Sequence, residues 1–137
     1  MEYNTVINSK FEDVDFQVEK IKELIKTNER KPSELFICII DFVVRELLNN
    51  AIEHGNKFDK EKKIKFTLDL EYDKLELIVI DEGDGFVLDE ILEKQKTDDV
   101  LKTRNRGLLT IKDIGFNIVV EKSKVKANII LGEKYFK

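Results

Sequence analysis

Hydrophobic positions recur along this chain with two different periods. Between residues 11 and 25 they are spaced by three and four positions, which predicts an amphipathic helix. A second helical pattern begins at Pro32 and Ser33, continues to Ile52 and ends at the polar stretch 54–56. Because the first half of this second helix is apolar on nearly every side, it is either deeply buried or in contact with another subunit, and burial is the favoured interpretation.

Segments with a period of two predict a sheet. Residues 64–70 and 75–80 flank a turn at 72–74 and predict two antiparallel strands. The other predicted elements are strands at 3–7, 116–120 and 127–131, a helix at 107–114 that stops at Gly115, and a short helix at 87–92. Since helices precede and interrupt these strands, the pattern predicts an α+β fold: a two-layer sandwich of a mixed, mostly antiparallel sheet with helices on one face.

Length and composition narrow the class of protein. The 137 residues fit one domain, which we expect to span 1–137. The 24 basic and 28 acidic side chains give a net charge of -4, which disfavours nonspecific binding to nucleic acid. The single cysteine, Cys38, is expected to be a core thiol, and the sequence shows neither a secretion signal nor an apolar stretch of about 20 residues. These features predict a protein of the reducing cytoplasm without a membrane segment.

The stretch from residue 86 to residue 106 follows neither period beyond the short helical pattern near its start. It is strongly polar after Leu92. A loop longer than about 12 to 15 residues is unusual inside a compact domain and is typical of a lid or a binding element. We therefore expect this stretch to serve a site.

Polar side chains gather on one face of the second predicted helix near its end. At about 100° per residue, Glu46, Asn50 and Glu53 share a face with Ile39 and Val43. This face changes from apolar to acidic and amide-bearing, as expected at the wall of a pocket. An amide oxygen beside a carboxylate suits Mg²⁺, which keeps waters and bridges to substrate phosphates. The alternative is a helix end that simply emerges into solvent.

Two glycine-bearing stretches could also contact a ligand. Asp81 follows an apolar strand and precedes Gly83 and Gly85, so its carboxylate could accept a hydrogen bond from an amine such as that of adenine. Gly107 follows Arg106 at the start of a predicted helix, where main-chain N–H groups and basic side chains could hold phosphate. An ordinary turn explains the first stretch equally well, and a basic loop with a helix cap explains the second.

Taken in this order, the stretches 46–55, 81–86 and 104–111 resemble the N, G1 and G2 boxes of GHKL ATPases. Each box alone is weakly specific, whereas the ordered set is strongly specific, and the similarity covers essentially the whole chain. In its compact length the chain is most similar to the bacterial anti-sigma-factor serine/threonine kinases of partner-switching pathways. The resemblance implies the Bergerat fold of these ATPases, with ATP and Mg²⁺ as cofactors.

The resemblance also implies roles for individual residues. Glu46 matches the glutamate that activates the acceptor hydroxyl, Asn50 matches the asparagine that holds Mg²⁺, and Asp81 matches the aspartate that binds the adenine amine. The stretch 86–106 becomes the ATP lid. The residues expected to contact the nucleotide are Asn50, Asp81, Gly83, Gly85, Arg106, Gly107, Leu108 and Thr110.

The expected partners follow from the same resemblance. The chain is expected to phosphorylate Ser or Thr of a STAS-type anti-sigma-factor antagonist and to bind a sigma factor, with Arg104 as a candidate contact to the partner protein. A homodimer is expected, through the apolar half of the second helix and the N-terminal strand. Two alternatives stay open: a non-catalytic module that uses nucleotide only to sequester a partner, and a detached histidine-kinase catalytic domain. The second is disfavoured because these residues contain no separate dimerisation hairpin with an acceptor histidine.

Two features bear on phosphoryl transfer more than on nucleotide binding. The family often has Gly-Arg-Gly where this chain has Asn105-Arg106-Gly107, and asparagine tolerates left-handed backbone better than most residues do. The acidic pair at 98–99 inside the expected lid would repel a triphosphate unless the metal or nearby lysines offset its charge.

Overall fold

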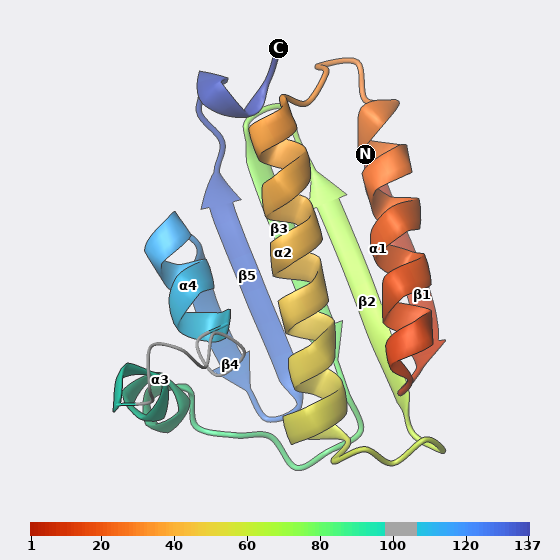
Figure 1. The fold of residues 1–137 in the computed structure, drawn as a ribbon, viewed down its shortest axis with the longest axis vertical. Helices are drawn as coiled ribbons and strands as arrows, with labels where there is room; N and C mark the ends of the chain where they lie inside the picture. Colours follow the sequence, from red (N-terminus) through yellow and green to blue (C-terminus); the bar gives the residue numbers. More distant parts are fainter. Residues whose placement is uncertain (98–106) are drawn as a thin grey trace.

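The computed structural model describes residues 1–97 and 107–137, which form two layers (Figure 1). One layer is a sheet whose five described strands lie in the order β1-β2-β3-β5-β4, and each neighbouring pair is antiparallel. The strands are β1 (Glu2–Asn8), β2 (Lys63–Leu70), β3 (Lys74–Ile80), β4 (Asn117–Glu121) and β5 (Lys124–Ile130). The predicted α+β sandwich is confirmed, and within the described residues its sheet is wholly antiparallel rather than mixed.

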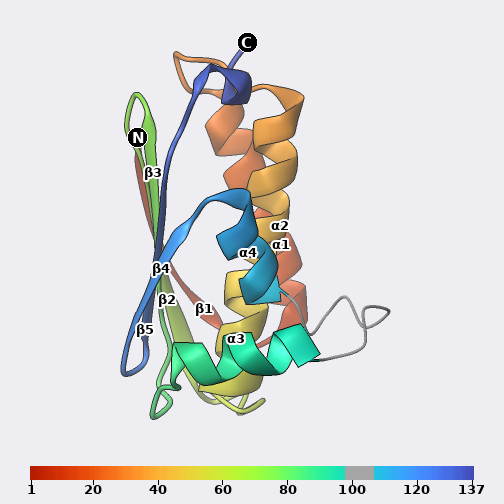
Figure 2. The ribbon, with the colours of Figure 1, turned by 90° about the vertical axis from the view of Figure 1, so that its left-hand side faces the viewer.

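The second layer consists of helices on one face of the sheet (Figure 2). The helices are α1 (Phe11–Lys26), α2 (Glu34–Asn50), α3 (Leu88–Thr97) and α4 (Gly107–Ile114), with a π-helical turn at Ala51–Gly55 and a 3-10 turn at Glu133–Tyr135. α2 runs along the middle of the sheet, and α3 lies at the end of the molecule where α2 ends (Figure 1). In the described parts of the chain, no helix combines the length and the apolar character needed to cross a membrane.

The core lies between the two layers because the strands alternate as predicted. Phe66 of β2 is fully buried and stands between Thr5 of β1 and Val79 of β3 in the register of the sheet. The helix α2 contributes the largest share of the facing layer through Phe36, Ile40, Val43, Val44, Leu47 and Leu48. Burial of apolar surface at roughly 25 cal/mol per Å² therefore fixes α2 against the sheet, and with α2 the polar residues at its end.

The two ends of α2 are set by different interactions. At its start, the Ser33 hydroxyl oxygen accepts a hydrogen bond from the Phe36 N–H at 3.2 Å, as expected of an N-cap residue. At its end, the π-helical turn is closed by the Asn56 N–H, which donates to the Ala51 carbonyl at 2.7 Å. The predicted helix end at 54–56 is therefore correct, although the last turn is wider than an α-helical one.

Cys38 does not lie in the core. The sequence predicts a core thiol at this position, but the cysteine is exposed, so that prediction is wrong. The reason is helical phase, since Cys38 is two residues from both Phe36 and Ile40 and so points about 200° away from these buried side chains. The predicted burial of the first half of α2 is thus confirmed for one side of the helix only.

The helix α3 is longer than the sequence predicts. The pattern indicates a helix at 87–92, whereas the structure continues it to Thr97. One contact with α4 explains the difference: the buried Gln95 accepts a hydrogen bond from the Leu109 N–H at 2.7 Å. A tertiary contact therefore extends a helix whose own sequence is mostly polar.

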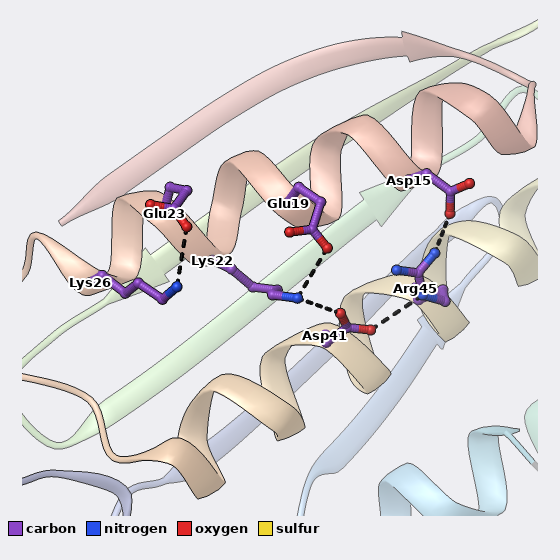
Figure 3. A network of polar contacts seen from close by, with 7 residues as sticks. All are labelled: Asp15, Glu19, Lys22, Glu23, Lys26, Asp41 and Arg45. Atoms are coloured by element: carbon purple, nitrogen blue, oxygen red, sulfur yellow. Dashed lines mark hydrogen bonds and ion pairs between the residues drawn. The ribbon is translucent and has the colours of Figure 1, made fainter.

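Charged side chains join α1 and α2 on the outer surface of the helical layer (Figure 3). Lys22 binds Glu19 at 3.0 Å and Asp41 at 2.8 Å. Arg45 binds Asp41 at 3.3 Å and also binds Asp15. We call these five residues the α1–α2 ion network. It holds the helix that carries the predicted site residues against its neighbour.

Candidate functional site

The predicted site residues of α2 and α4 are in contact. Gly107 is the first residue of α4 and is buried. A Cβ atom added to Gly107 would lie 2.1 Å from Oε2 of Glu46, so only glycine fits beside this carboxylate without a shift. The structure therefore places the predicted base directly against the N-terminus of a helix, where main-chain N–H groups and the helix dipole favour anions.

The loop after β3 packs against the turn that follows α2. A Cβ atom on Gly55 would lie 2.0 Å from Oδ2 of Asp81, and a Cβ atom on Gly83 would lie 2.0 Å from the Gly55 carbonyl oxygen. The loop and the turn can approach this closely only because neither glycine has a side chain. Residues that the sequence predicts to share a site, but that lie in different elements, are thus brought together.

Asp81 is a buried carboxylate whose orientation is fixed. It is 6% exposed, its Oδ1 accepts a hydrogen bond from the Gly83 N–H at 2.8 Å, and its own N–H donates to the Ser123 carbonyl at 3.0 Å. Burial raises the pKa of the Asp81 carboxyl, and the Gly83 N–H and the positive charge of Lys62 offset only part of that rise. A buried acceptor of this kind is suited to bind a neutral donor such as an amine.

The Asn50 amide is bonded to its own helix through one end only. Its Nδ2 donates to the Glu46 carbonyl at 2.9 Å, so the bond uses the nitrogen end and leaves the oxygen end, which can ligate a cation, outside it. Within residues 1–97 and 107–137, no group of three or more His, Cys, Asp and Glu side chains could hold a metal ion. A single protein oxygen fits Mg²⁺, which takes its other ligands from phosphates and water.

The remaining predicted residues differ in what they can contribute. Gly85 has φ +90°, and a Cβ there would lie 2.3 Å from the Lys122 carbonyl oxygen, so this glycine is needed for packing against the β4–β5 turn. Leu108 is 1% exposed, which leaves only its main chain for a ligand, whereas Thr110 is partly exposed. Arg106 lies outside the described residues. The same is true of Arg104, Asn105 and the acidic pair at 98–99.

Two side chains that support the site have no chemical signal in the sequence. Gln95 is 7% exposed and accepts from the Leu109 N–H, which ties α3 to the first turn of α4. Asn56 is 1% exposed and binds three other segments of the chain. Helical spacing places Gln95 on the same face as Ile91 and Leu92, but its polar type gives no signal of burial. Asn56 lies in a turn that follows no period.

Comparison with known protein families shows which family this chain belongs to. The sequence profile of the histidine kinase-like ATPase domain matches residues 17–131, which is most of the chain. The chain belongs to the histidine kinase-like ATPase domain family. This match confirms the predicted resemblance to GHKL ATPases at the level of the superfamily. It supports ATP binding, and it is consistent with kinase-type use of ATP.

The solved structures agree on the fold. One that matches is the histidine kinase domain from the Erythrobacter litoralis EL346 blue-light activated histidine kinase, with a TM-score of 0.55 and 15% sequence identity. The match covers 88% of this chain and 62% of that one, so this chain spans less than two thirds of the matched structure. At this identity the likeness is one of fold alone. Among curated protein sequences, no significant match is found.

Proposed function

We propose that this ATPase domain is an anti-sigma-factor kinase that phosphorylates Ser or Thr of a STAS-type antagonist and also binds a sigma factor. The observation that carries the proposal is the contact between Glu46 and Gly107. The contact brings a carboxylate beside a helix N-terminus, where main-chain N–H groups can hold phosphates. A base and a phosphate site must be neighbours if a hydroxyl is to attack the terminal phosphoryl group.

Nucleotide recognition is assigned to the other half of the same site. The buried Asp81 would accept a hydrogen bond from the adenine amine, and Gly55 and Gly83 keep the space beside it free of side chains. The oxygen end of Asn50 would hold Mg²⁺, which neutralises charge on the phosphates when it is bound. These residues fit ATP because the acceptor, the glycine contacts and the amide oxygen all lie around the end of α2.

Phosphoryl transfer needs mainly positioning and charge neutralisation. Glu46 would accept the proton of the Ser or Thr hydroxyl as that oxygen bonds to the terminal phosphorus. The bond from this phosphorus to the bridging oxygen breaks, and ADP leaves. The contact with Gly107 places the Glu46 carboxylate at the α4 N-terminus, next to the proposed phosphate site.

The proposal is tested by transfer of radiolabelled γ-phosphate to a purified STAS-type antagonist. We expect the wild type to label the antagonist, and Glu46→Ala to lose at least about 100-fold in transfer rate while keeping its affinity for ATP. Glu23→Ala is the matched control, because Glu23 is an exposed acid of α1 that pairs with Lys26.

Acid treatment of the product identifies the acceptor. Phosphate on Ser or Thr survives acid, whereas phosphate on a histidine nitrogen is released. ATP binding without labelling of any antagonist would instead favour the non-catalytic sequestering module. Full activity of Glu46→Ala would refute the assigned base.

A homodimer is part of the proposed function. Its candidate surfaces are the outward side of the first half of α2, where Leu35 is 44% exposed, and the outer face of β1, where Val6 is 61% exposed. Sedimentation equilibrium of the wild type, of Leu35→Lys and of Val6→Lys tests both surfaces. A dimer that Leu35→Lys dissociates places the interface on α2, and one that Val6→Lys dissociates places it on β1.

A further inference from the structure

The Asn56 side chain is buried and is the centre of a set of hydrogen bonds beside the site. Its Oδ1 accepts from the Glu82 N–H at 2.8 Å. Its Nδ2 donates to the Ser9 hydroxyl at 2.6 Å and to the Lys63 carbonyl at 3.1 Å. One side chain thus joins the turn after α2 to the residue that follows β1, to the first residue of β2 and to the loop after β3.

Three of these residues form a closed ring of hydrogen bonds. Glu82 donates its N–H to Asn56, Asn56 donates to the Lys63 carbonyl, and the Lys63 N–H donates to the Glu82 carboxylate. The ring requires a side chain that both accepts from an N–H and donates to a carbonyl, and the Asn56 amide does so with two separate atoms, Oδ1 and Nδ2. A carboxylate at position 56 could not donate, and an apolar side chain would leave the buried Ser9 hydroxyl and the part-buried groups of Lys63 and Glu82 without this partner.

The ring holds the residue next to Asp81. Glu82 directly follows Asp81, and the Gly83 N–H fixes one oxygen of the Asp81 carboxylate. Asn56 directly follows Gly55, whose main chain contacts both Asp81 and Gly83. Because Glu82 is bonded to Asn56, the Asp81 carboxylate is held in a fixed position relative to the turn that contains Gly55.

The backbone after Asn56 is held in an unfavourable conformation. Lys57 and Phe58 have φ values of 51° and 63°, which place two consecutive non-glycine residues in the left-handed region. Each such residue costs roughly 1–2 kcal/mol, so the surrounding contacts must fix the turn. The Phe58 N–H donates to the Ile52 carbonyl at 2.8 Å, and the Asp59 N–H donates to the Asn56 carbonyl at 3.0 Å. The turn at 55–58 is therefore a fixed support rather than a loose connection.

We propose that Asn56 is a positioning residue that gives the site its selectivity for the exocyclic amine of the purine. It acts through Glu82, by holding Asp81 where the carboxylate can accept the amine hydrogen bond. This inference rests on the proposed nucleotide site, and it adds the residue that sets the direction of the acceptor. A side chain that only stabilised the fold would lower the affinity for all purine nucleotides alike.

The test compares ATP with purine riboside triphosphate, which lacks the 6-amino group, by equilibrium titration of each variant. A hydrogen bond to a charged group contributes enough for wild type to prefer ATP by about 10- to 100-fold. We expect this preference to fall to about threefold or less in Asn56→Ala, with a much smaller change in the affinity for purine riboside triphosphate. Asn56→Ser, which is shorter and cannot reach both Glu82 and Lys63, should give the same result if Asn56→Ala does not fold.

Two control variants separate positioning from stability. Ser9→Ala removes one partner of Asn56 and leaves the bond to Glu82. Gln17→Leu removes a buried amide of α1 that accepts from the hydroxyl of Tyr3 in β1. Both should lower the melting temperature while keeping the preference for ATP.

Each remaining outcome counts against a stated claim. If wild type prefers ATP and Asn56→Ala or Asn56→Ser keeps that preference, the positioning role is wrong while the nucleotide site stands. If the two controls lose the preference as completely as the Asn56 variants do, the effect is one of stability and the positioning role is again wrong. If wild type binds both nucleotides equally, Asp81 does not read the amine and the inference fails. If wild type binds neither, the proposed function itself fails.

Discussion

Gly83 and Gly107 both face the candidate site, but a methyl group added to each would meet a different kind of atom. On Gly107 the methyl group would meet the end of the Glu46 side chain at 2.1 Å, and on Gly83 it would meet the main-chain oxygen of Gly55 at 2.0 Å. A side-chain end can rotate away, whereas a main-chain oxygen in a packed turn cannot. The two substitutions therefore separate function from stability.

We predict that Gly107→Ala impairs phosphoryl transfer more than it impairs folding. The displaced Glu46 carboxylate should lower the transfer rate by about tenfold or more, while the free energy of unfolding changes by no more than about 1 kcal/mol. Gly83→Ala is the comparison, and we expect it to destabilise the domain by roughly 2–4 kcal/mol because backbone must move. Urea unfolding and transfer assays on both variants check this, and equal losses of stability would show that Glu46 is not free to rotate.

Single residues also show which parts of the candidate site a sequence can point to and which it cannot. Glu46, Asn50, Asp81 and Gly107 could be singled out because their types and order match known boxes, and the structure gathers them around the end of α2. Asn56 could not be identified in the same way. Its partners Ser9, Lys63 and Glu82 lie 47, 7 and 26 positions away, so no local pattern connects them.

At the scale of elements, periodicity predicts those helices whose buried face packs against the sheet along their whole length. α1 and α2 follow from their apolar spacing because one face of each is buried along its length. The outward side of α2 is apolar as well, so spacing alone could not place Cys38 on the surface. The extent of α3 also escapes prediction, since its last turns depend on the bond between Gln95 and α4.

The α1–α2 ion network stabilises two helices through one shared carboxylate. Burial raises the pKa of the Asp41 carboxyl, but hydrogen bonds from Lys22 and Arg45 and the charges of both cations outweigh burial and hold the pKa below its usual value of 3.8. The folded state thus favours the ionised form. Its contribution to stability is present above the unfolded pKa and is lost as the pH falls through the lower, folded value.

We predict that the stabilising effect of Asp41 disappears in acid. Near neutral pH, Asp41→Asn should unfold more easily than wild type by about 1 kcal/mol, a typical magnitude for a partly exposed network. The difference should narrow once the pH falls below 3.8, because wild type then loses the charge that the variant already lacks. Urea unfolding from neutral to acidic pH measures it, with Asp15→Asn as control because the Asp15 side chain is 69% exposed and should matter less. A difference that stays constant across this range would contradict the assignment.

At the scale of the whole molecule, the site joins segments from most of the chain. The turn after α2, the loop after β3 and the start of α4 lie in separate stretches of sequence, and the sheet order β1-β2-β3-β5-β4 brings them to one end of the two layers (Figure 1). Alternation of side chains predicts that a sheet and a helical layer exist. The strand order and the close approach of Gly55 to Asp81 are long-range pairings that no local pattern specifies.

Because the site draws on distant segments, unfolding of any one of them should remove it, and ATP should stabilise the domain as a unit. A ligand present at 100 times its Kd adds about 2.7 kcal/mol to the free energy of unfolding. We predict that ATP raises the melting temperature of wild type, and that Mg²⁺ raises it further. Asn50→Ala should keep the increase with ATP alone and lose the increment due to Mg²⁺, since the variant lacks the amide oxygen assigned to the metal.

Each variant is compared with its own ligand-free melting temperature, because Asn50→Ala also removes the bond from Nδ2 to the Glu46 carbonyl. Asp81→Asn is the opposite control. If the amide oxygen introduced by this substitution keeps the bond from the Gly83 N–H, the new NH2 group faces the adenine amine, and two donors cannot form a hydrogen bond. The rise in melting temperature with ATP and the further rise with Mg²⁺ should therefore both become smaller. If Asn50→Ala keeps the full rise in melting temperature with Mg²⁺, the metal is bound by other ligands. If both variants lose the rises with ATP and with Mg²⁺ equally, the metal and the adenine are not bound by separate residues of this site.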